Sequence, residues 1–127
     1  MANWDPEPVP SRESGMTWLL RSGDVLATAE VADGFWGRSK GLIGRADYDG
    51  VLVLTHTRSV HSFGMRFPMD VALCMGDENS DLVVRRMIRL PQWRITIPRV
   101  GCRTVVEAEA GAFERWGLQV GDVLKLR

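Results

Sequence analysis

The residues best able to do chemistry are concentrated in the segment 57–71. It contains a histidine and an aspartate, His61 and Asp70, with two arginines, two phenylalanines and two methionines. A glycine and a proline lie between the histidine and the aspartate, and both residue types favour a bent chain. A carboxylate beside an imidazole can fix its tautomer and raise its pKa, as a general base requires. The segment is therefore our first candidate for a functional site.

Three interpretations of this segment stay open. His61 could act as a general base oriented by Asp70, as in a hydrolase. The segment could instead line a ligand-binding groove. It could also be a turn that serves only the fold, because an aspartate just after Pro68 can accept amide protons within its own turn. We favour the binding groove. No Gly-x-Ser-x-Gly motif accompanies the segment, so nothing indicates a serine nucleophile.

A metal site is not indicated by the sequence. Such a site would draw on His56, His61, Asp70 and Glu107, but two histidines five positions apart match no recognised ligand pattern. The two cysteines, Cys74 and Cys102, also lack metal-binding spacing. We expect two buried thiols rather than a disulfide, and we expect neither a metal nor another cofactor.

A second cluster of functional residue types lies between residues 85 and 103. Arginines beside an aromatic residue can hold phosphates and stack a base, so single-stranded nucleic acid is an alternative ligand. Strand alternation, however, separates Arg86 from Arg85 and Arg89, and the net charge of the chain is zero. We therefore consider nucleic-acid binding unlikely. The arginines of this run are Arg85, Arg86, Arg89, Arg94, Arg99 and Arg103, with Trp93 among them.

Length and composition predict one ordinary globular domain. The chain has 127 residues, of which 45% are hydrophobic and 25% are charged. The proline-rich residues 1–15 predict a flexible leader, and residues 16–127 predict the domain. No targeting signal or membrane-spanning run is visible, so we expect a cytoplasmic protein without membrane contact.

The elements that position these residues are mostly strands. Turn signals recur every eight to twelve residues, and the strand–helix alternation of a parallel sheet is missing. This pattern predicts a mainly antiparallel β sandwich or open barrel with two short helices. The expected strands are 17–21, 25–31, 51–54, 71–75, 82–90, 95–97, 104–108 and 123–126, and the expected helices are 35–43 and 110–116.

Four sequence blocks, 38–45, 61–71, 106–111 and 117–122, occur in an order that resembles the domain-of-unknown-function 192 family of small bacterial and archaeal proteins. The resemblance extends from about residue 27 to residue 125. It implies a compact, mostly β, clam-like fold, and it brings no established reaction. The matched positions are Arg38, Lys40, Arg45, His61, Met65, Pro68, Asp70, Glu107, Gly111, Gly121 and Asp122.

Together these observations predict a non-catalytic domain that binds a small polar or anionic molecule in one groove. Basic side chains would supply cationic donors, phenylalanines an apolar wall, and His61 with Asp70 directional hydrogen bonds. Glu107 shares a strand face with Val105 and should point inward, where a buried carboxylate needs a partner such as Arg38 or Arg45. The oligomeric state stays open. The expected ligand-binding residues are Arg38, Lys40, Arg45, His61, Phe63, Met65, Phe67, Asp70 and Glu107.

Overall fold

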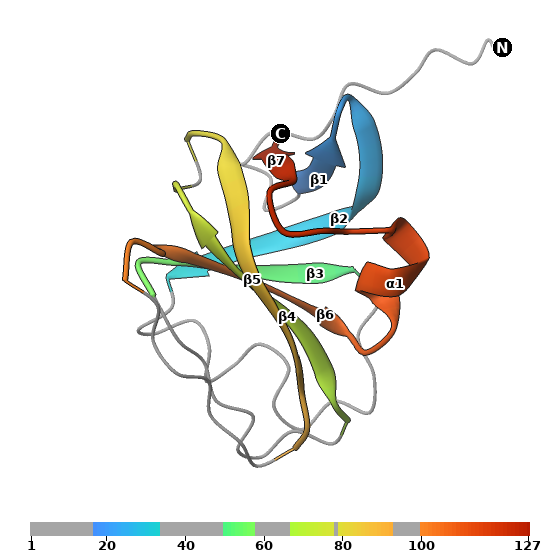
Figure 1. Ribbon diagram of the computed structural model, residues 1–127. Helices are drawn as coiled ribbons and strands as arrows, with labels where there is room; N and C mark the ends of the chain where they lie inside the picture. The colour runs from blue at the N-terminus through green and yellow to red at the C-terminus, as the bar shows by residue number, and fades with distance from the viewer. Residues whose placement is uncertain (1–16, 34–49, 58–66, 78, 93–99) are drawn as a thin grey trace, which may run out of the picture.

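The computed structural model describes residues 17–33, 50–57, 67–77, 79–92 and 100–127. Within these ranges, seven strands form a closed barrel in the order β1-β2-β3-β6-β4-β5-β7 (Figure 1). The expected sandwich or open barrel is therefore corrected to a closed barrel. The strands are β1 (Thr17–Arg21), β2 (Asp24–Asp33), β3 (Val51–Thr55), β4 (Met69–Met75), β5 (Leu82–Leu90), β6 (Thr104–Glu109) and β7 (Val123–Leu126).

The barrel closes through its last strand. The four residues of β7 pair with β1 on one side and with β5 on the other, where Leu82 lies opposite Leu124 and Val83 opposite Val123. All strand pairs of the described residues are antiparallel except β2–β3. A parallel pair needs a crossover connection of a dozen or more residues, and the segment between β2 and β3 is long enough to provide it. The prediction of a mainly antiparallel fold is confirmed.

One short helix, α1 (Ala112–Trp116), is present in the described part of the chain. It corresponds to the helix expected at 110–116 and begins two residues later. The other expected helix, 35–43, and the expected strand 95–97 fall outside the described residues, so two helices are not supported. No described helix has the length and apolar character needed to cross a membrane.

The barrel walls are buried on both faces along β3 and β4. Every residue of β3 is buried, and so is every residue of β4 except the last, as expected for strands that read as continuous apolar runs. Alternate residues contribute to two apolar clusters, which we call the first core and the second core. The first core has members from all seven strands and from α1, including Leu19, Val53, Ala72, Ala108, Phe113 and Leu124. The second core lies on the opposite face and includes Leu52, Leu54, Met69, Val71, Leu90 and Val105.

Candidate functional site

Three of the nine expected ligand-binding residues lie in the described part of the chain, namely Phe67, Asp70 and Glu107. Phe67 is partly buried and packs against the second core, so its ring contributes to the fold. The remaining six lie outside the described residues: Arg38, Lys40, Arg45, His61, Phe63 and Met65.

Asp70 is the buried carboxylate on which two distant segments converge. Its side chain in β4 is 5% exposed. Oδ2 accepts a hydrogen bond from the Gly111 N–H at 2.9 Å and another from the Phe113 N–H at 3.1 Å. Oδ1 accepts a third from the Arg89 Nε–H at 3.0 Å, and this contact is also an ion pair. Both oxygens are thus engaged by protein donors.

The two amide contacts give Asp70 the role of a helix cap supplied from another strand. The residue before α1 is Gly111, which has φ of 100° and no side chain with which to cap the helix. The first amides of a helix have no partner within it and need an acceptor. Asp70 supplies that acceptor to amides 41 and 43 residues away. One interpretation of the sequence has Asp70 accept amide protons within its own turn, whereas these two amides belong to α1 and its cap.

Glu107 is also buried, and it points to the other face of the sheet. It is 1% exposed, as expected from the strand face that it shares with Val105. In the β4–β6 register, Glu107 lies opposite Val71 of the second core, whereas Asp70 lies opposite Ala108 of the first core. Side chains on neighbouring residues of a strand project to opposite faces. The two expected site carboxylates therefore do not share a face.

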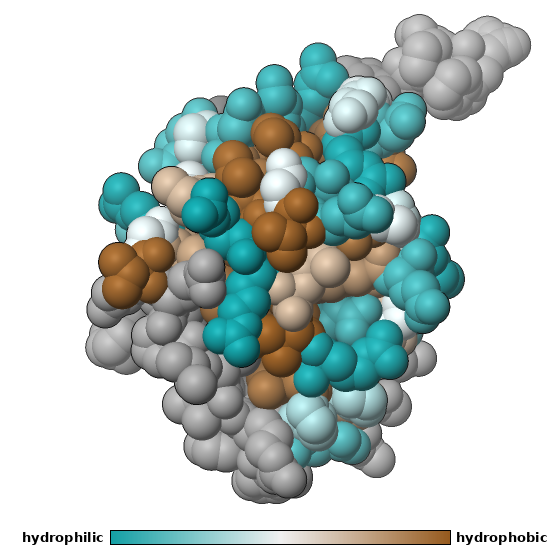
Figure 2. Space-filling view, in the orientation of Figure 1, coloured by the Kyte–Doolittle hydropathy of each residue, from teal (hydrophilic) through white to brown (hydrophobic). Residues whose placement is uncertain are grey.

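A cavity of about 290 Å³ lies beside the Asp70–Arg89 pair. Its walls come from β5 and α1, and Figure 2 shows tan and brown side chains between the hydrophilic surfaces over these two elements. The Arg89 side chain is 55% exposed. Its Nε donates to Asp70, and no other hydrogen bond or ion pair joins its guanidinium to a described residue. The lining residues are Asp70, Met87, Ile88, Arg89, Phe113 and Glu114.

The arginines of β5 are divided between faces, as alternation predicts. Arg86 lies opposite Leu73 of the second core, and Arg89 lies opposite Asp70. The register between β4 and β5 shifts between Leu73 and Cys74, so Arg85 is the extra residue of a bulge. These described arginines do not form a single cationic face of the kind that a nucleic-acid strand would follow.

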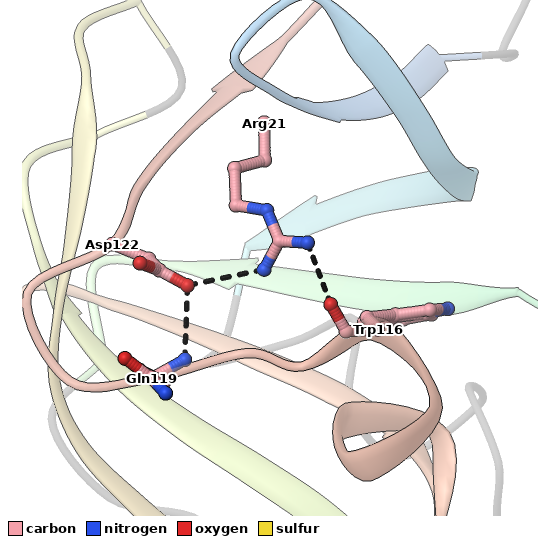
Figure 3. Close-up of polar contacts among 4 residues, drawn as sticks. All are labelled: Arg21, Trp116, Gln119 and Asp122. Carbon is pink, nitrogen blue, oxygen red and sulfur yellow. Dashed lines mark hydrogen bonds and ion pairs between the residues drawn. The ribbon is translucent and has the colours of Figure 1, made fainter.

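A second carboxylate contact, at Asp122, anchors the segment between α1 and β7. Figure 3 shows that Asp122 Oδ2 accepts from Arg21 Nη1 at 3.1 Å and from the Gln119 N–H at 2.9 Å. Arg21 Nη2 also donates to the Trp116 carbonyl at 2.6 Å, at the end of α1. Asp122 is one of the matched positions. Arg21 and Trp116 were not anticipated, because no local pattern links β1 to this segment.

The cysteines carry no indication of reactivity. Cys74 and Cys102 are both buried and are not joined by a disulfide, as we expected. Burial, with a smaller contribution from the neighbouring Cys102, raises the pKa of the Cys74 thiol from 9.0 to about 12. Since the thiolate is the nucleophilic form, Cys74 acts as a packing residue.

Another cavity, of about 550 Å³, lies between the β1–β2 turn and β7. It is the larger of the two, but no matched position lines it. Two cations line it, Lys125 and Arg127, and Lys125 forms an exposed pair with Asp81 at 3.7 Å. Such a pair contributes little binding energy. The smaller cavity beside Asp70 is therefore the better candidate site.

Comparisons with known proteins identify the fold and a family. A protein of unknown function from Novosphingobium aromaticivorans DSM 12444 is similar, with 16% sequence identity and a TM-score of 0.66 over 87% of this chain and 83% of that chain. A putative transcription regulator from Sinorhizobium meliloti 1021 is similar, with 23% identity and a TM-score of 0.67 over 87% and 91% of the two chains. No curated protein matches the chain. The model of the DUF192 family, described as an uncharacterized ACR, matches residues 18–126, so this chain belongs to the DUF192 family.

Proposed function

We propose that this protein is a non-catalytic binding domain that takes a small polar or anionic ligand in the cavity beside Asp70 and Arg89. The observation that carries the proposal is the placement of Arg89. Asp70 holds its guanidinium by Nε at 3.0 Å, while more than half of the side chain stays exposed beside the cavity. A guanidinium held in this way can present its remaining N–H groups to a carboxylate or phosphate.

The surroundings of Arg89 suit a small ligand with one anionic group. Met87 and Phe113 give the cavity an apolar wall, and small-molecule sites typically combine such walls with a few polar groups. Glu114 also lines the cavity and is exposed. Its carboxylate disfavours a second negative charge inside the cavity, so a single anionic group, as in a monoanion or a zwitterion such as an amino acid, fits better there than a polyphosphate.

The state of Asp70 weighs against a hydrolase that uses His61 as base. An orienting carboxylate must keep an acceptor position for the imidazole. Three of the roughly four acceptor positions of Asp70 already take N–H groups of Arg89, Gly111 and Phe113. Asp70 therefore supports the proposed site by positioning Arg89 and α1.

Thermal unfolding with acetate, glutamate and phosphate tests the proposal. A ligand at ten times its dissociation constant stabilises the fold by about 1.4 kcal/mol, which corresponds to a Tm increase of roughly 5 °C in a domain of this size. We expect glutamate or acetate to raise the Tm of the wild type and to leave that of Arg89→Gln unchanged. Arg115→Gln is the matched control, because this exposed arginine pairs with Glu109 and does not line the cavity. A shift that persists in Arg89→Gln, or no shift with any of the three anions, would refute the proposed site.

A further inference from the structure

Among the described residues, strand β5 has no backbone partner along most of one edge, which we call the open edge. On the side away from β4, Val84 is bonded by both backbone groups: its N–H donates to the Asp122 carbonyl at 3.0 Å, and its carbonyl accepts from the Gly121 N–H at 2.8 Å. Beyond Val84, the described residues provide no backbone partner on this side as far as Leu90. Six residues of extended strand span roughly 20 Å at about 3.4 Å per residue.

This open edge adjoins the proposed ligand cavity. Met87, Ile88 and Arg89 belong both to the edge and to the cavity lining, and α1 forms the opposite wall with Phe113 and Glu114. Alternate residues of an unpaired edge direct their N–H and C=O groups outward, where they can pair with another chain. The cavity thus combines backbone donors and acceptors with an apolar wall.

The charge of the edge selects the kind of chain that can pair with it. Strand β5 carries Arg85, Arg86 and Arg89 and no acidic residue. Arg89 shares its charge with Asp70, whereas Arg85 and Arg86 are exposed and form no salt bridge with a described residue. Edge arginines discourage pairing between identical copies, because like charges would meet. The same arginines favour an acidic strand.

We propose that the open edge of β5 binds an extended acidic segment of a partner protein as an added strand. This inference rests on the proposed function, because Arg89 would be the group that receives one acidic side chain. The backbone edge supplies the affinity that is common to all extended peptides, and the arginines supply the specificity.

The register of β5 predicts the partner's pattern. In an added strand, the residue opposite Arg89 would lie on the first-core face of the sheet, and the residue opposite Arg86 would lie on the second-core face. Met87 and Ile88 separate the two arginines along β5. A segment Glu-Val-Val-Glu therefore places its acids opposite Arg86 and Arg89 and its valines opposite Met87 and Ile88. The pattern reads the same in both directions, so it fits a parallel or an antiparallel strand.

The test is a titration of the ¹⁵N-labelled full chain with acetyl-Thr-Glu-Val-Val-Glu-Thr-amide. We expect amide shifts concentrated at residues 85–90, and binding roughly tenfold weaker when both glutamates are replaced by glutamine. The isomer with Val-Glu-Glu-Val at its centre should weaken similarly. Arg86→Gln, an exposed change that leaves the Asp70–Arg89 pair intact, should weaken binding about threefold, and Arg115→Gln should leave it unchanged.

Two N-methylated peptides test the backbone pairing. One is methylated on the first glutamate and the second valine, and the other on the first valine and the second glutamate. Because N–H groups of a strand point alternately to its two edges, we expect one methylated peptide to lose binding and the other to retain it. Equal binding of both peptides would overturn the added strand.

The remaining outcomes separate the two proposals. If free glutamate shifts the resonances of the cavity and the peptide binds no more tightly, the proposed function stands and the added strand is overturned. If neither ligand perturbs residues 85–90, both proposals are refuted. If an oligothymidylate binds more tightly than the peptide and displaces it, the edge is a nucleic-acid site and the acidic-peptide inference is wrong.

Discussion

Replacing Asp70 by alanine should destabilise the protein far more than removing its charged partner. The substitution deletes the acceptor of two amides, the partly buried one of Gly111 and the buried one of Phe113, and of the Arg89 Nε–H. Loss of a helix cap costs about 0.5–2 kcal/mol, and a buried donor left without a partner costs about 1–3 kcal/mol. The ion pair adds at most about 1 kcal/mol, because the Arg89 side chain is 55% exposed to screening solvent. We expect a total loss of about 3 kcal/mol.

Urea unfolding and thermal unfolding both measure this loss. At about 2.1 cal/mol/K of unfolding entropy per residue, 3 kcal/mol lowers the Tm by roughly 11 °C. Arg89→Gln keeps the two amide contacts of Asp70 and should lose only about 1 kcal/mol, or roughly 4 °C. Asp70→Asn keeps one carbonyl acceptor and should fall between the two.

The order of the three variants is the decisive result. If Arg89→Gln loses as much free energy of unfolding as Asp70→Ala, then the ion pair rather than the helix cap is the main contribution, and our reasoning on α1 is wrong. A loss below about 1 kcal/mol in Asp70→Ala would mean that the amides of α1 find other acceptors. If Asp70→Ala is as stable as the wild type but no longer binds the ligand, then Asp70 takes part in binding directly.

Three further predictions concern the Arg21–Asp122 ion pair, the Cys74 thiol and the turn at Gly76. Asp122→Ala removes the partner of Arg21 and should lower the free energy of unfolding by about 1–2 kcal/mol, with an unchanged dependence on urea concentration. If only the hydrogen-exchange protection of the β7 amides falls and the global free energy of unfolding stays the same, the prediction is wrong. Burial raises the pKa of Cys74 from 9.0 to about 12, so the folded state holds this proton more tightly, and the resulting stabilisation is complete below pH 9 and is lost as the pH rises towards 12. Urea unfolding at a series of pH values should show a smaller decline of the free energy of unfolding above pH 9 in Cys74→Ala than in the wild type, and an equal decline would exclude the thiol as its source. Gly76→Ala places a Cβ against the Asp81 carbonyl oxygen at φ of 100° and should lower the free energy of unfolding by at least about 2 kcal/mol. Gly23→Ala has a similar φ of 85° but open space around the Cβ, and should lower it by about 1 kcal/mol. Equal losses on thermal unfolding would show that the positive φ, and not the contact with the oxygen, determines the cost.

The local elements could be predicted because their signals are local. Strands β1, β5 and β7 match the expected ranges 17–21, 82–90 and 123–126, since turn residues delimit each apolar run. The fully buried strands were recognisable as unbroken apolar segments. The closure of the barrel was not predictable, because it depends on a few pairs such as Leu82 with Leu124 between distant segments.

The site was harder to predict because its geometry depends on register. Alternation within β6 correctly placed Glu107 on a buried face, but alternation in one strand does not say which residue of β4 lies opposite. The observed pairing of Val71 with Glu107 separates Glu107 from Asp70. The sequence did contain one unused signal: Gly111 precedes α1 where a side-chain cap is usual, so the capping acceptor had to come from elsewhere.

The contacts of three matched positions, Asp70, Gly111 and Asp122, explain why β7 covers only the beginning of β5 in the described part of the chain. Asp70 and Gly111 fix the start of α1, and Asp122 fixes the chain that leads from α1 into β7. These contacts hold a strand of four residues against one of nine. A short closing strand covers only the beginning of its longer neighbour, so the rest of β5 is left facing α1 across a cavity. Asp70 and Asp122 therefore help to fix where the barrel closes, and in our proposals the binding chemistry falls to the arginines of β5.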